Sequence, residues 1–107
     1  MALAFETTEV KFYPAKGGTK SLPGTATFKR AVRAADASVK GFELGFTGDD
    51  HHLFMQQIQV KNVKTNGPTV TFDVDLGLRD KSGHYDDTYE GKVWVLVTAD
   101  TDERGDA

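Results

Sequence analysis

Apolar and polar residues alternate along much of this chain, and a period of two residues is typical of a strand with one buried face. From Val70 to Arg79, apolar side chains occupy every even position, and the odd positions carry Thr71, Asp73, Asp75, a glycine and the arginine. The strands predicted from patterns of this kind are residues 5–13, 25–32, 39–46, 53–63, 70–79 and 91–100.

Turn-forming residues separate these stretches. Asn66-Gly67 is the strongest two-residue hairpin signal in the sequence, and Leu22-Pro23-Gly24 predicts another turn. Residues 31–37 favour a helix locally but are too few to form one, so we interpret them as a strand end and a loop. About six antiparallel strands joined by short turns predict an all-β fold, an antiparallel β-sandwich.

The composition supports strands over helices. Valine, isoleucine and threonine together number 23, against seven leucines, and eleven glycines interrupt the segments. The 107 residues suffice for one domain, and without cysteine its core must hold without disulfide bonds. We expect a single domain over residues 1–100 and an acidic tail over residues 101–107.

Charge and hydropathy exclude several classes of partner. The formal net charge is −3 and the isoelectric point is near 5.5, which argues against nucleic acid or an anionic membrane as a partner. No apolar run is long enough to span a bilayer, and the first residues lack the pattern of a signal peptide. We therefore expect a soluble protein, with its location unassigned.

The last strand differs from the others because both of its faces are apolar. Residues 93, 95, 97 and 99 line one face, and Trp94 and Leu96 line the other. A strand that is apolar on both faces is normally buried on both. One interpretation is a homo-oligomer with Trp94 and Leu96 at the subunit interface. The alternative is that residues 14–24 fold over the outer face.

One loop concentrates the groups that recognise sugars, which need hydroxyl acceptors, donors and an aromatic face. Residues 49–107 carry a net charge of −6, which disfavours anionic ligands and favours neutral saccharides. The candidate carbohydrate-binding residues are Arg79, Asp80, His84, Tyr85, Asp86, Asp87 and Tyr89.

Two acidic segments raise the question of a metal ion. In Asp49-Asp50-His51-His52, adjacent histidines on a strand would point to opposite faces, whereas zinc needs converging ligands. Asp80, Ser82, Asp86 and Asp87 could wrap Ca²⁺, but Gly83 comes too early for the EF-hand pattern. A solvated turn explains each segment better, so we expect neither a metal nor a cofactor, and folding without Ca²⁺.

The sequence offers little for catalysis. It has no cysteine nucleophile, no Gly-x-Ser-x-Gly motif, no phosphate-binding loop and no His-Glu-x-x-His motif. Asp73 and Asp75 share the polar face of a strand, where no apolar surroundings would raise a pKa. We therefore expect a protein that is not an enzyme.

Two short motifs flank the central alternating strand: the turn Val63-Lys64-Thr65-Asn66-Gly67 before it, and the aromatic-x-acid-threonine segment Tyr85-Asp86-Asp87-Thr88 after it. In both motifs, residues 39–99 resemble the H-type lectin family, which has a similar turn and a similar loop. The apolar last strand, with Trp94 and the ending Val97-Thr98-Ala99, also fits. The family usually has tryptophan where Tyr85 stands, and its sugar-contacting arginine has no counterpart near His52 or Leu53.

This resemblance implies a fold and a function. H-type lectins are six-stranded antiparallel sandwiches that assemble as trimers or hexamers and bind galactose-type sugars near subunit interfaces. It therefore implies a lectin-like, carbohydrate-binding homo-oligomer, with a trimer as the first expectation and a hexamer as the alternative. The competing function is a structural or assembly subunit of a phage-like or surface particle, without a small-molecule ligand.

Overall fold

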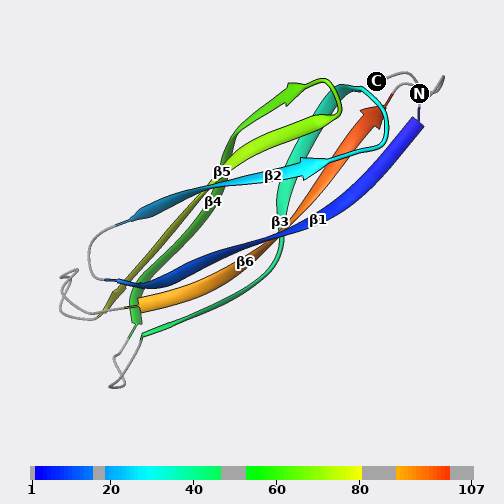
Figure 1. Ribbon diagram of the computed structural model, residues 1–107. Coiled ribbons are helices and arrows are strands. Elements are labelled where there is room, and N and C mark those ends of the chain that lie inside the picture. The colour runs from blue at the N-terminus through cyan, green and yellow to red at the C-terminus, as the bar shows by residue number, and fades with distance from the viewer. Residues whose placement is uncertain (1, 16–18, 47–52, 81–88, 102–107) are drawn as a thin grey trace.

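The computed structural model describes residues 2–15, 19–46, 53–80 and 89–101, and all six of its elements are strands (Figure 1). The predicted all-β fold is therefore confirmed. None of the described residues forms a helix long and apolar enough to cross a membrane. The strands are β1 (Ala2–Ala15), β2 (Lys20–Thr27), β3 (Val32–Phe46), β4 (Leu53–Asn66), β5 (Thr69–Asp80) and β6 (Tyr89–Thr101).

The strands form two antiparallel three-stranded sheets, with the order β1-β6-β3 in sheet A and β2-β5-β4 in sheet B. The two central strands, β5 and β6, carry most of the core. Alternate residues of each are almost fully buried, so these two faces are the inner faces of the sandwich. These buried residues are Val70, Phe72, Val74, Leu76, Val93, Val95, Val97 and Ala99.

The hairpin predicted at Asn66-Gly67 exists, but its two loop residues are Gly67 and Pro68. Gly67 has a φ of +58°, in the region that L-residues with a side chain avoid. Pro68 must keep a negative φ, which excludes a type I′ turn and fits a type II′ turn with glycine in first position. The turn carbonyls of Pro68 and Gly67 accept hydrogen bonds from the backbone N–H groups of Phe28 (2.8 Å) and Val32 (2.9 Å).

The turn predicted at Leu22-Pro23-Gly24 is wrong, because these residues lie inside β2. β2 is an edge strand, where proline is tolerated because no partner needs its missing N–H group. Gly24 pairs with Phe72, and the Phe72 ring lies where a Cβ on residue 24 would be. Glycine is thus required by the close packing of β2 against the Phe72 ring of β5.

The strand end and loop predicted over residues 31–37 are also wrong, since a strand, β3, begins at Val32 and continues through this segment. Ala35 pairs with Ala99, and Ala37 pairs with Val97, so both alanines pack against the core. Pairing with β6 therefore overrides the local helix preference of this alanine-rich segment.

The polar face of sheet B holds a buried carboxylate. Asp75 is only 7% exposed, and its Oδ2 lies 2.8 Å from Lys61 Nζ. The hydrogen bond from Lys61 holds the pKa of Asp75 below its ordinary value of 3.8, with help from Ser21 and against the opposing effect of burial. Beside it, Asn62 Nδ2 donates to Asp73 Oδ2 at 2.9 Å. This face is therefore an organised polar network, and not merely a solvated surface.

We predict that ionised Asp75 stabilises the fold and that this contribution is lost in acid. A carboxylate whose pKa is lower in the folded chain contributes stability at pH values above its ordinary pKa of 3.8. That stability is lost as the pH falls through the folded pKa. Thermal unfolding measured from pH 7 to pH 2, in about unit steps, should show a smaller acid loss for Asp75→Asn than for the natural chain. Asp36→Asn, at an exposed carboxylate, is the control and should follow the natural chain. Equal acid losses in all three proteins would contradict the prediction.

Candidate functional site

All the sequence-predicted loop residues attach to one end of the sandwich, which we call the loop end. β1, β3 and β5 finish there, and β2, β4 and β6 begin there (Figure 1). Phe46 pairs with Tyr89 in sheet A, and Leu53 pairs with Asp80 in sheet B. Segment 47–52 connects Phe46 to Leu53, and segment 81–88 connects Asp80 to Tyr89. Each residue that bounds one segment is therefore paired with a residue that bounds the other. The two candidate segments are consequently tethered to the same end.

Most of the predicted carbohydrate-binding side chains fall outside the described part of the chain. The backbones of Arg79 and Asp80 form the last two positions of β5. The other candidates, with the exception of Tyr89, lie in segment 81–88, outside the described residues. They are His84, Tyr85, Asp86 and Asp87.

Tyr89, the first residue of β6, belongs to the core. Its side chain has no exposed surface, and its hydroxyl donates to the Leu76 carbonyl oxygen at 3.1 Å. Lys20 Nζ lies 3.8 Å from the centroid of its ring and donates to its backbone carbonyl at 3.1 Å. Burial lowers the pKa of Lys20 from its ordinary value of 10.5. Tyr89 therefore ties the first residues of β2 and β6 together beneath the loop end, and the structure gives its ring no contact with the surface.

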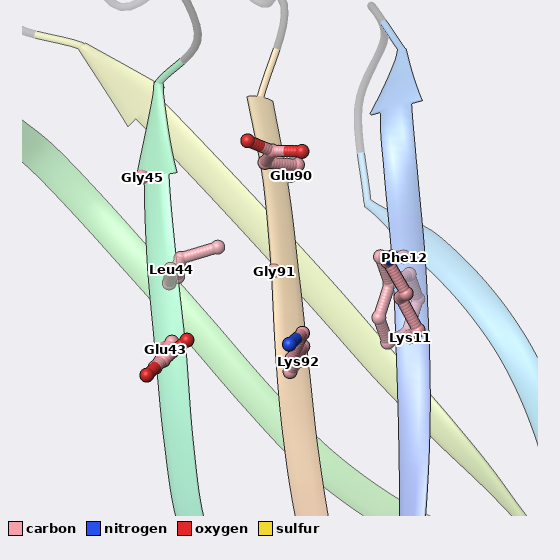
Figure 2. Close-up of a pocket in the computed structure, with 8 residues that line it drawn as sticks. All are labelled: Lys11, Phe12, Glu43, Leu44, Gly45, Glu90, Gly91 and Lys92. Atoms are coloured by element: carbon pink, nitrogen blue, oxygen red, sulfur yellow. The ribbon is translucent and has the colours of Figure 1, made fainter.

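A hollow of about 340 Å³ opens on the outer face of sheet A next to the loop end. Figure 2 shows its charged side chains on three neighbouring strands. Lys11 of β1 and Glu43 of β3 both stand opposite Lys92 of β6, which makes one row across the sheet. The full lining is Lys11, Phe12, Glu43, Leu44, Gly45, Glu90, Gly91 and Lys92.

The floor of this hollow is backbone, because the next row consists of residues whose side chains point into the core. Gly91 is the central residue of that row, between Phe12 and Leu44. A Cβ on Gly91 would come within 2.7 Å of the Glu43 carbonyl oxygen, so glycine is needed there. Gly45, on the rim, has no atom within 4 Å of its missing Cβ and leaves the hollow open. Ammonium donors and carboxylate acceptors thus surround an accessible recess.

The sequence did not single out Lys11, Glu43, Glu90 or Lys92. The polar positions 90 and 92 do precede Trp94 on the same face of β6, which is a visible signal. Their neighbours on β1 and β3 are about 80 and 50 residues away along the chain, and only the pairing of β6 with both strands brings them together.

The predicted interface residues, Trp94 and Leu96, lie half-buried on the outer face of sheet A. Lys40 reaches from β3 across β6 and donates to Thr7 Oγ1 on β1 at 3.1 Å, and with Gly41 it lines a recess beside Trp94. The described part of residues 14–24 does not cover this face, because β2 belongs to the opposite sheet.

Metal ligands do not converge in the part of the chain that the structure describes. There, no group of three or more histidine, aspartate or glutamate side chains could hold an ion. The two segments in which the sequence raised zinc and calcium, residues 49–52 and most of 80–87, lie outside it.

We predict that Tyr89→Ala lowers the free energy of unfolding by about 3–5 kcal/mol, the usual loss for a buried aromatic ring. Tyr89→Phe keeps the ring but leaves the Leu76 carbonyl without this donor, which should cost about 1 kcal/mol. Urea unfolding of both variants measures the two losses, and Tyr13→Ala, at an exposed tyrosine, is the control. An alanine variant at position 89 as stable as the natural chain would contradict the assignment of Tyr89 to the core.

No family model, curated protein or solved structure matches this chain. The resemblance of residues 39–99 to H-type lectins therefore stays a prediction from the sequence. The function must be inferred from the fold and from the chemistry at the loop end.

Proposed function

We propose that this protein is a non-catalytic, carbohydrate-binding homo-oligomer whose saccharide site lies at the loop end. The observation that carries the proposal is the pairing of Phe46 with Tyr89 and of Leu53 with Asp80. This pairing attaches the loop that carries the candidate carbohydrate-binding residues, and also the segment Asp49–His52, to the same end of the sandwich. Loops held by a rigid scaffold are where binding residues concentrate.

The chemistry of this end suits a neutral sugar. Arg79, Asp80, His84, Asp86 and Asp87 offer donors and acceptors for vicinal hydroxyl groups, and Tyr85 offers an aromatic face. The hollow continues the same chemistry on the described surface, since its carboxylates accept hydrogen bonds and its ammonium groups donate them. Tyr89 was predicted from the sequence as a ligand contact. It is buried, and its role in this proposal is to hold the start of β6 next to the site.

The assembly would form through the outer face of sheet A, around Trp94 and Leu96. The molecule measures 55 × 18 × 17 Å, so one long face offers about 1,000 Å². A stable interface needs about 800 Å² from each partner. Several weak sites on one oligomer raise the avidity for a multivalent glycan, which gives oligomerisation a direct use in carbohydrate binding. The resemblance to H-type lectins makes a trimer the first expectation.

We predict weak binding of a neutral saccharide, with a dissociation constant of about tens of micromolar to millimolar per site. Asp87→Ala should lose about 1–3 kcal/mol of binding free energy, because it removes an acceptor from bound hydroxyl groups. Isothermal titration after a glycan screen measures the loss. Asp36→Ala, which removes an exposed carboxylate far along β3 from the loop end, is the matched control and should bind as the natural chain does.

Two results would contradict the saccharide site. Affinity unchanged by Asp87→Ala would move the site away from this loop, with residues 49–52 as the next region to test. A broad glycan screen without any binding, from a stable oligomer, would favour the structural or assembly subunit instead.

We predict that Trp94→Asp disrupts the face contact and weakens association by about 2 kcal/mol or more, roughly 30-fold in the dissociation constant. Light scattering over a concentration series measures this change. Phe42→Asp, which places the same charge at an exposed apolar residue whose side chain lies on the opposite side of sheet A, is the control. A natural chain that scatters as a monomer of 11.7 kDa would contradict the proposed oligomer.

A further inference from the structure

β1 is the least protected edge strand of the sandwich. The four edge strands are β1 and β3 in sheet A and β2 and β4 in sheet B. β2 carries Pro23, whereas β3 and β4 each contain two breaks of register. From Ala2 to Phe12, β1 pairs with β6 without any proline or bulge. Prolines and bulges are the usual devices that prevent an edge from pairing with another strand, and this stretch has neither.

The beginning of β1 also exposes large apolar side chains. Leu3 and Phe5 are each 60% exposed and point to the outer face of sheet A, beside β6. Figure 1 shows this part of β1, in dark blue, at the margin of the ribbon. Antiparallel edge strands direct half of their backbone N–H and C=O groups away from the sheet. This edge therefore offers hydrogen-bonding groups together with apolar contacts.

A second hollow, of about 380 Å³, lies next to these exposed side chains. It separates the first residues of β1 from residues 27–30, and buried Phe28 contributes an apolar wall. Glu6, Lys29 and Arg30 all line it, so the same recess presents one acidic and two basic groups. Leu3 and Phe5 lie on the outer face of sheet A, whereas Glu6 pairs with the inward-facing Val97 and lies on the inner side, with the recess. When two copies of an antiparallel edge pair about a two-fold axis, each face continues into the same face of the second copy, so the exposed apolar side chains of both copies would lie together.

We propose that the edge of β1 over residues 2–8 pairs with the same edge of a second copy of this chain, antiparallel and about a two-fold axis. Such pairing would join two copies of sheet A into one continuous six-stranded sheet. Odd residues must stand opposite odd residues, because a shift by one would turn Leu3 and Phe5 to the wrong face. The register with Glu6 opposite its own copy is disfavoured by charge repulsion. Phe5 is thereby placed within reach of Leu3 or Phe5 of the second copy.

This edge contact is separate from the face contact around Trp94 and does not depend on saccharide binding. A two-fold edge contact gives assemblies with an even number of chains. Combined with a trimer formed through the face, it gives a hexamer.

The test compares two lysine substitutions at exposed aromatic residues of the same strand. Phe5→Lys would place a like-charged pair across the two-fold axis and should raise the dissociation constant of the edge contact at least about tenfold. Tyr13→Lys introduces the same charge at a residue that is 70% exposed but lies beyond the unbroken stretch, so it should change nothing. Sedimentation velocity of the full chain measures both, and both variants should remain folded because both side chains are exposed.

Disulfide trapping gives an independent readout, since the natural chain contains no cysteine. Phe5→Cys should form a covalent dimer under mild oxidation much faster than Tyr13→Cys does. Equal trapping rates, or equal sedimentation of Phe5→Lys and Tyr13→Lys, would overturn the edge contact.

The outcomes separate this proposal from the proposed function. Association lost in Trp94→Asp but kept in Phe5→Lys would overturn the edge contact and leave the face contact intact. A glycan screen without binding, together with a clear loss in Phe5→Lys, would overturn the saccharide function and support the edge contact.

Discussion

The mutual burial of the inner faces of β5 and β6 is the constraint on which the rest of the molecule depends. Val93, Val95 and Val97 have no exposed surface, and neither do Val74 and Leu76. Each fully buried aliphatic side chain contributes about 1.5–3 kcal/mol, and no other pair of strands in the described chain buries as many. Both strands are central in their sheets, so every edge strand is positioned by pairing with one of them.

The central place of β6 has consequences on its other face. Because its odd residues point into the core, Trp94 and Leu96 must point out of sheet A, together with Glu90 and Lys92. The face is therefore charged near the loop end and apolar further along β6. Leu3 and Phe5 on β1 extend its apolar part to the edge of the sheet. β6 thus lies between the recess near the candidate saccharide site, the face around Trp94 and, through its pairing with β1, the edge that carries Leu3 and Phe5.

The loop end itself is held by contacts that a simple hydrophobic pattern does not reveal. Lys20 begins β2 in sheet B, and Tyr89 begins β6 in sheet A. A cation–π contact and a hydrogen bond join these two residues. The Tyr89 hydroxyl then reaches Leu76 in the opposite sheet. If segment 81–88 binds a saccharide as proposed, the anchor at Tyr89 fixes its C-terminal end and reduces the conformational entropy that is lost on binding.

The sequence by itself determined the all-β class, the hairpin near Gly67 and the inner faces of β5 and β6, because period-two patterns and turn residues act locally. It did not determine that Leu22-Pro23-Gly24 lies inside a strand, since only an edge position and the Phe72 ring make that segment acceptable there. Local preference likewise failed for Ala35 and Ala37, whose conformation is set by pairing with β6. The row of Lys11, Lys92 and Glu43 and the burial of Tyr89 were decided only by the tertiary structure, because they join residues that are distant along the chain.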